Sequence, residues 1–239
     1  SKIFLQICFL LFGIVCNSPW SSVTACLDFF AFYQNSLIKP AFFYPMAYNT
    51  ANLIFTIILV IFTLNTNKLL LMIYLGFSVI LTAAIPFPPI NCSVKVGFGL
   101  TLAFFILLCL LGALIQNGYY ALSSVLPKDI IVFFSIGHAA AGVLVSFIRL
   151  MIILGLGTKK KGIYLDVEIF FPISAFVIVI SIILTFIVYK NKLFNEYIMI
   201  KKENEKNEYR IMNKESENKD ESKQEEIKSE NEIKKDNEI

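Results

Sequence analysis

The sequence predicts an all-α fold, a polytopic membrane helix bundle, and two observations carry this prediction. Of the 239 residues, 56% are hydrophobic and 16% are charged, and the mean hydropathy is +0.69. A water-soluble chain does not have so much apolar surface, so the excess should face lipid. Charge is also segregated, because residues 201–239 hold 10 of the 21 Lys and Arg residues and 13 of the 18 Asp and Glu residues. We therefore predict a six-helix transmembrane bundle over residues 1–189 and a charged, disordered cytosolic tail over residues 190–239.

Six apolar segments are long enough to cross a bilayer, for which a helix needs about 20 residues. They cover residues 3–30, 47–65, 69–87, 96–120, 131–155 and 168–189. Turn residues or charges separate them at 39–45, 65–68, 86–95, 127–129 and 157–162. Six crossings place both ends of the bundle on one side of the membrane. Because the second and third loops are short, the helices that they join should pack as antiparallel pairs.

Lysines close to the last span favour a cytosolic tail and hence a cytosolic N-terminus. They are Lys190, Lys192, Lys201 and Lys202. The same orientation leaves three lysines at 159–161 outside, against the rule. It also places the sequon at 91–93 outside, but so close to a helix end that we expect it to be unused.

The residues that carry chemistry in soluble proteins are scarce or badly spaced. The five cysteines show no CxxC spacing and lie mostly in apolar runs, so we predict neither a metal site nor a disulfide framework. They are Cys8, Cys16, Cys26, Cys92 and Cys109. With one histidine, no HExxH or GxSxG motif and no paired carboxylates in the spans, we expect no enzyme. We also expect no cofactor and no nucleic-acid partner.

Polar residues within several spans fall on one helical face. In the first span they are Gly13, Asn17, Trp20, Ser21, Thr24 and Asp28; in the second, Asn49, Asn52, Thr56 and Thr63; in the fifth, Ser135, His138, Ala139, Gly142, Ser146 and Arg149; in the sixth, Ser174, Ser181 and Thr185. Such faces either pack against other helices or line a pathway. For Ser and Thr, packing is the commoner explanation.

Ionisable residues in a span are more informative, because burying them is expensive and they usually have a partner. We predict an ion pair between Asp28 and Arg149 near the outer ends of the first and fifth spans. His138 is more often a hydrogen-bonded helix contact than a proton carrier. Pro19 removes a backbone donor, so we expect a kink just before Trp20.

The fourth span ends on two neighbouring carboxamides, Gln116 and Asn117. Within a membrane both need partners, which other helices or a solute supply. A carboxamide offers donors and an acceptor, so it suits the edge of a nucleobase as well as another helix. Trp20, the one tryptophan, is either a membrane-interface anchor or part of a deeper site.

Three blocks together resemble the N-terminal half of an equilibrative nucleoside transporter. They are Pro19-Trp20-Ser21-Ser22, then Gly112-Ala113-Leu114-Ile115-Gln116-Asn117-Gly118 with Leu126-Pro127, and Gly137-His138-Ala139-Ala140-Ala141-Gly142. Their order and spacing cover about residues 1–189. The resemblance implies a major-facilitator-like fold of eleven helices, in which six helices precede a long cytosolic loop and five follow it.

The resemblance also implies roles for single residues. Trp20 would pack against the nucleobase and Gln116 would hydrogen-bond its edge, with Asn117 beside it. Ser21 stands where many members have Asn, so its polar contact would be shorter. The family's ribose-binding Asp and Arg belong to the second half, which this chain lacks, so we expect a fragment whose partner is the missing five-helix half.

The leading hypothesis is facilitative transport of nucleosides or nucleobases, purines above all, by alternating access, in the plasma membrane. One alternative is a truncated scaffold or half-transporter without transport activity of its own. Another is a carrier for a different small polar solute. Asn17, Asn52, Asp28, His138 and Arg149 are then structural or gating polar residues.

Overall fold

The computed structural model describes residues 2–34, 39–62, 68–156, 160–201 and 203. By its internal contacts the chain divides into two units, Ser1–Phe194 and Asn195–Ile239. The predicted disordered tail, residues 190–239, lies for the most part outside the described residues.

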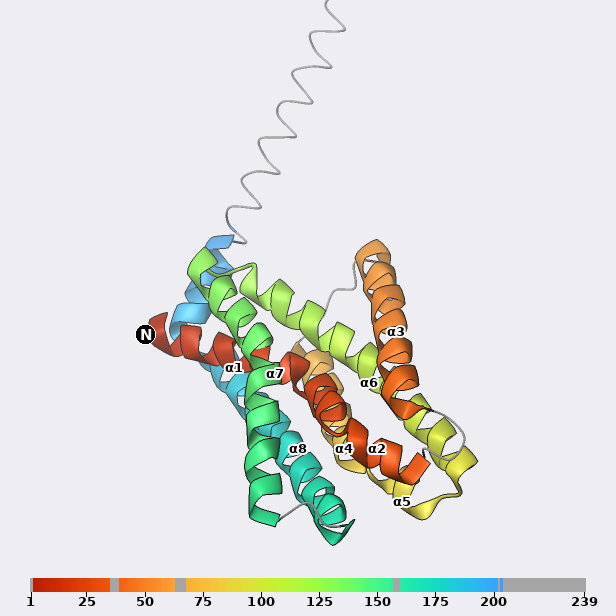
Figure 1. Cartoon of the computed structure of the whole chain (residues 1–239). Helices are drawn as coiled ribbons and strands as arrows, with labels where there is room; N and C mark the ends of the chain where they lie inside the picture. Colours follow the sequence, from red (N-terminus) through yellow and green to blue (C-terminus); the bar gives the residue numbers. More distant parts are fainter. Residues whose placement is uncertain (1, 35–38, 63–67, 157–159, 202, 204–239) are drawn as a thin grey trace, which may run out of the picture. The chain divides into compact units, whose positions relative to one another are not determined.

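The described residues form helices and no strand, which confirms the all-α prediction (Figure 1). The helices are α1 (Lys2–Ala25), α2 (Leu27–Gln34), α3 (Pro40–Phe62), α4 (Lys68–Ala84), α5 (Phe87–Asn91), α6 (Val94–Ser123), α7 (Lys128–Leu156) and α8 (Lys160–Lys190). Six stretches within them are long and apolar enough to cross a membrane: Lys2–Ala25, Pro40–Leu59, Lys68–Asn91, Val94–Ser123, Lys128–Gly155 and Leu165–Lys190. The protein is therefore an integral, multi-pass membrane protein.

The kink expected just before Trp20 stays a prediction, and the helix itself ends several residues after Pro19. α1 continues through Pro19, and the interruption comes at Cys26, before α2 begins. There the backbone N–H of Cys26 donates to the carbonyl of Val23 at 3.1 Å, a tightened turn that ends α1. The short helix α2 thus starts anew and carries Asp28 at its first turn, a position that suits a carboxylate.

Glycines let α1 and α7 approach at backbone distance. A Cβ on Gly13 would overlap the carbonyl of Phe134 and lie 2.7 Å from the backbone nitrogen of His138. A Cβ on Gly137 would overlap the carbonyl of Leu10 in the same way. Small residues at such crossings are the usual means of close helix packing within a membrane.

Helix pairing departs from the prediction at one place. Among the described residues α4 packs mainly against α6 and α8, and α3 packs mainly against α6, although a short loop joins α3 to α4. A short loop holds only the adjoining helix ends together. Along its length α3 follows α6, where its Tyr44 makes an edge-on contact with Phe105 at 4.6 Å.

Candidate functional site

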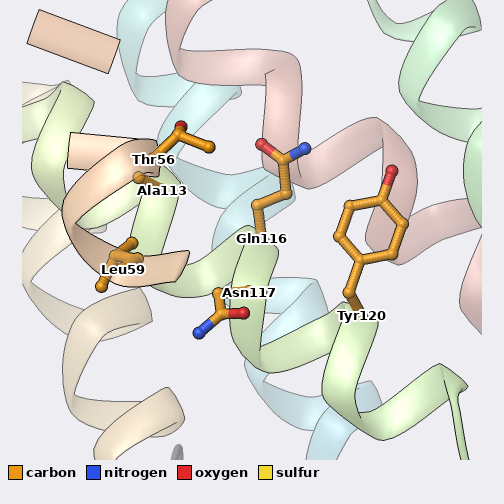
Figure 2. A pocket seen from close by; sticks show the side chains of 6 residues that line it. All are labelled: Thr56, Leu59, Ala113, Gln116, Asn117 and Tyr120. Atoms are coloured by element: carbon orange, nitrogen blue, oxygen red, sulfur yellow. The ribbon is translucent and has the colours of Figure 1, made fainter. Parts of the chain in front are cut away.

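A pocket of about 200 Å³ lies between α3 and α6 (Figure 2). Its lining residues are Thr56 and Leu59 of α3 and Ala113, Gln116, Asn117 and Tyr120 of α6. Figure 2 shows Gln116 and Tyr120 rising side by side from α6, with Asn117 nearer to Leu59. The pocket is smaller than the roughly 300 to 1,000 Å³ that is usual for small-molecule sites, and its described lining residues come from two helices.

One face of α6 creates this pocket. Residues three or four apart lie on the same side of a helix, so Cys109, Gly112, Gln116 and Tyr120 share the face toward α3. At Gly112 the helices are close, because a Cβ there would meet the hydroxyl of Tyr48 at 3.7 Å. The Cys109 thiol also donates to the Tyr48 carbonyl at 3.5 Å. The pocket opens one turn beyond this contact.

The two carboxamides of the pocket make no hydrogen bond to any residue that the structure describes. Both side chains are half-buried. Buried polar groups in proteins are almost always satisfied, so Gln116 and Asn117 have donor and acceptor capacity available for a solute or water.

Trp20 does not line the pocket but contacts its neighbourhood through Tyr48. The indole of Trp20 stacks on the ring of Tyr48, with centroids 4.0 Å apart and an interplanar angle of 11°. Tyr48 in turn touches α6 at Cys109 and Gly112. A row of neighbouring residues therefore runs across three helices, from Trp20 of α1 through Tyr48 of α3 to the face of α6 that carries Gln116.

The polar faces of the first and fifth spans face each other. The amide of Asn17 donates to the carbonyl of His138 at 3.2 Å. Buried Ser21 lies opposite Gly142, with its hydroxyl oxygen 3.9 Å from where a Cβ would stand. His138 is half-buried, and its Nδ1 has no hydrogen-bond partner among the described residues. Ser21, expected at the substrate, thus lies in the α1–α7 contact.

Asn52, one of the polar residues predicted for the second span, is half-buried on α3. It lies one turn before Thr56, which does line the pocket. The face predicted for this span therefore continues toward the pocket rather than toward α1.

A charged cluster joins α2, α7 and α8. Arg149 pairs with Asp28 at 2.8 Å, as the sequence predicts, and with Asp166 at 2.9 Å, which it does not. The side chains of Arg149 and Asp166 are only 8% and 3% exposed, whereas that of Asp28 is 56% exposed. Two carboxylates thus share one guanidinium, and the second of them, Asp166, was not predicted from the sequence. Asp166 was missed because it precedes the apolar segment at 168–189, and nothing in the local sequence sets it apart.

Comparison with known proteins gives one family. A family model described as "Nucleoside transporter" matches residues 101–238, more than half of the chain. The matched region includes the α6 residues of the pocket together with α7 and α8. A comparison with curated proteins finds no match.

Proposed function

The chain belongs to the nucleoside transporter family, and on that premise we propose that it serves facilitative uptake of nucleosides or nucleobases, purines in particular, by alternating access. The observation that carries the proposal is the pair of carboxamides, Gln116 and Asn117, that face a membrane pocket and have no hydrogen-bond partner among the described residues. Such groups are costly in a membrane unless a solute or water uses them.

The chemistry of the pocket suits a purine. The carboxamide of Gln116 donates and accepts in one plane, which matches the alternating donors and acceptors at the edge of a base. Tyr120 beside it offers aromatic surface, on which a planar base packs with favourable geometry, and the stacked pair Trp20 and Tyr48 adjoins the pocket without lining it. This arrangement supports roles for Trp20, Gln116 and Asn117 in binding, with Ser21 contributing through the position of α1.

We propose further that a second bundle of helices supplies the remaining walls. The lining that the structure describes comes from α3 and α6, whereas sites of this class bury most of the ligand surface. In that arrangement residues 190–239 connect the bundles on the cytosolic side of the plasma membrane. A half-transporter that acts only as a scaffold is the competing possibility, since an open two-helix pocket alone holds a solute weakly.

Uptake of radiolabelled adenosine and hypoxanthine by cells that lack their own nucleoside carriers tests the proposal with the native protein. Gln116→Ala should raise KM about tenfold, because a hydrogen bond to a neutral group contributes about 0.5 to 1.5 kcal/mol and its loss leaves a base edge unpaired. Gln6→Ala is the matched control, a half-buried carboxamide of α1 outside the pocket, and should transport normally.

The outcomes separate the alternatives. Equal uptake by Gln116→Ala and Gln6→Ala would show that the pocket is not the substrate site. Saturable uptake of another small polar solute, with no uptake of adenosine or hypoxanthine, would favour the carrier for a different solute. An absence of any uptake with normal amounts of protein at the membrane would favour the scaffold.

A further inference from the structure

Two lysines converge on one aromatic ring at one end of the bundle. The ammonium group of Lys68, the first residue of α4, lies 4.8 Å from the centroid of the Phe186 ring, and that of Lys190, the last residue of α8, lies 4.4 Å from the same centroid. Lys68 also lies 5.0 Å from the ring of Tyr189. Both ammonium groups therefore lie within 4.8 Å of the centre of one ring, so the two positive charges are close to each other.

No carboxylate among the described residues forms a salt bridge with either lysine. This differs from Lys2, at the start of α1, which pairs with Asp129 at 2.6 Å. The face of an aromatic ring attracts a cation, but it does not neutralise two of them. Each ammonium has three donors, and contact with a ring leaves donors available. The pair is therefore suited to an anion with several acceptor oxygens.

The position of the pair identifies the anion. Lys68 begins one membrane-spanning stretch and Lys190 ends another, so both lie at the level of the lipid headgroups. Below them α4 and α8 present exposed apolar side chains on which an acyl chain can lie: Leu69, Ile73, Ile183, Phe186 and Ile187. Phe186 itself is 41% exposed, so the ring is accessible from the lipid. Phosphate above and hydrocarbon below is the chemistry of a phospholipid.

We propose that Lys68, Lys190 and Phe186 form a binding site for the phosphate headgroup of an anionic membrane phospholipid. The two ammonium groups bind phosphate oxygens, the ring holds the lysines in place, and the acyl chains lie along α4 and α8. An anionic lipid is favoured over a zwitterionic one because its net negative charge balances the two lysines, which have no salt bridge among the described residues. This site is separate from the α3–α6 pocket and does not depend on the proposed function.

Native mass spectrometry of the purified full chain tests this site, with phosphatidylglycerol and phosphatidylcholine as probes. The native chain should retain phosphatidylglycerol preferentially. Each lysine near a membrane surface contributes about 1 kcal/mol to binding of anionic lipid, so Lys68→Gln with Lys190→Gln should weaken it roughly 30-fold. The matched control, Lys39→Gln with Lys95→Gln, removes the same charge from exposed lysines outside this cluster and should leave binding unchanged.

Three further measurements keep the test decisive. Lys68→Arg with Lys190→Arg should retain the preference, and this variant also serves if the glutamine variant fails to fold. For the native chain, 1 M NaCl should reduce the preference strongly, because an interfacial ion pair is screened. Inorganic phosphate should neither bind nor displace the lipid. Equal retention of phosphatidylglycerol by the glutamine and control variants would overturn the site, as would a preference that persists at high salt or displacement by free phosphate.

Discussion

The two carboxylates that pair with Arg149 should contribute unequally to the stability of the protein. The guanidinium donates to Asp166 Oδ2 twice, from Nε at 3.1 Å and from Nη2 at 2.9 Å, and both side chains are buried. Its bond to Asp28 is as short, 2.9 Å from Nη2 to Oδ2, but the side chain of Asp28 is 56% exposed. Removing one partner of a buried pair costs about 3 to 5 kcal/mol, whereas an exposed pair contributes about 0.2 to 1 kcal/mol.

Asp166→Asn should therefore lower the free energy of unfolding by about 3 kcal/mol. This value is at the lower end of the range because Arg149 would still form its ion pair with Asp28. Asp28→Asn should lower it by no more than about 1 kcal/mol. Reversible denaturant unfolding in one detergent, followed by helical circular dichroism, measures both. Equal losses for the two variants would refute the argument that burial, and not distance, sets the contribution of each ion pair.

A double substitution separates pairing from burial. Arg149→Leu should cost about 3 to 5 kcal/mol because it leaves the Asp166 carboxylate buried without its cation. Arg149→Leu combined with Asp166→Leu removes both buried charges and should recover much of that loss, since apolar replacements of a buried pair are often neutral. If the double variant lost as much as the sum of the two single variants, the pair would not be coupled.

Two further predictions concern helix packing and use the same unfolding assay. Gly137→Ala should destabilise by about 1 to 3 kcal/mol, because its Cβ meets the backbone of Leu10, while Gly155→Ala on the same helix meets nothing within 4 Å and should be neutral or stabilising; equal effects would refute the close crossing. Tyr119→Phe removes a hydroxyl that lies 2.8 Å from that of buried Thr185 and should cost about 1 kcal/mol, whereas Tyr120→Phe, on the exposed neighbour, should cost less.

The six spans could be predicted because lipid imposes a local rule, an apolar run of sufficient length, that each segment obeys by itself. The Asp28–Arg149 pair could be predicted because two charges in apolar segments need partners. Asp166 could not, since it lies outside the apolar run at 168–189 and only the folded structure brings it to Arg149. The pairing of α3 was mispredicted for a related reason, because loop length does not determine which neighbour a helix follows along its whole length.

The polar helix faces show that a similar pattern in the sequence does not predict which face packs against another helix and which lines a pocket. The faces of the first and fifth spans look alike in sequence to that of the second, yet the Asn17 amide donates to the His138 carbonyl of α7, and Ser21 lies opposite Gly142 of the same helix. A group that already has a helix partner cannot also bind a solute without losing that contact. We therefore propose that recognition rests with Gln116 and Asn117, the carboxamides that line the pocket and have no hydrogen-bond partner among the described residues.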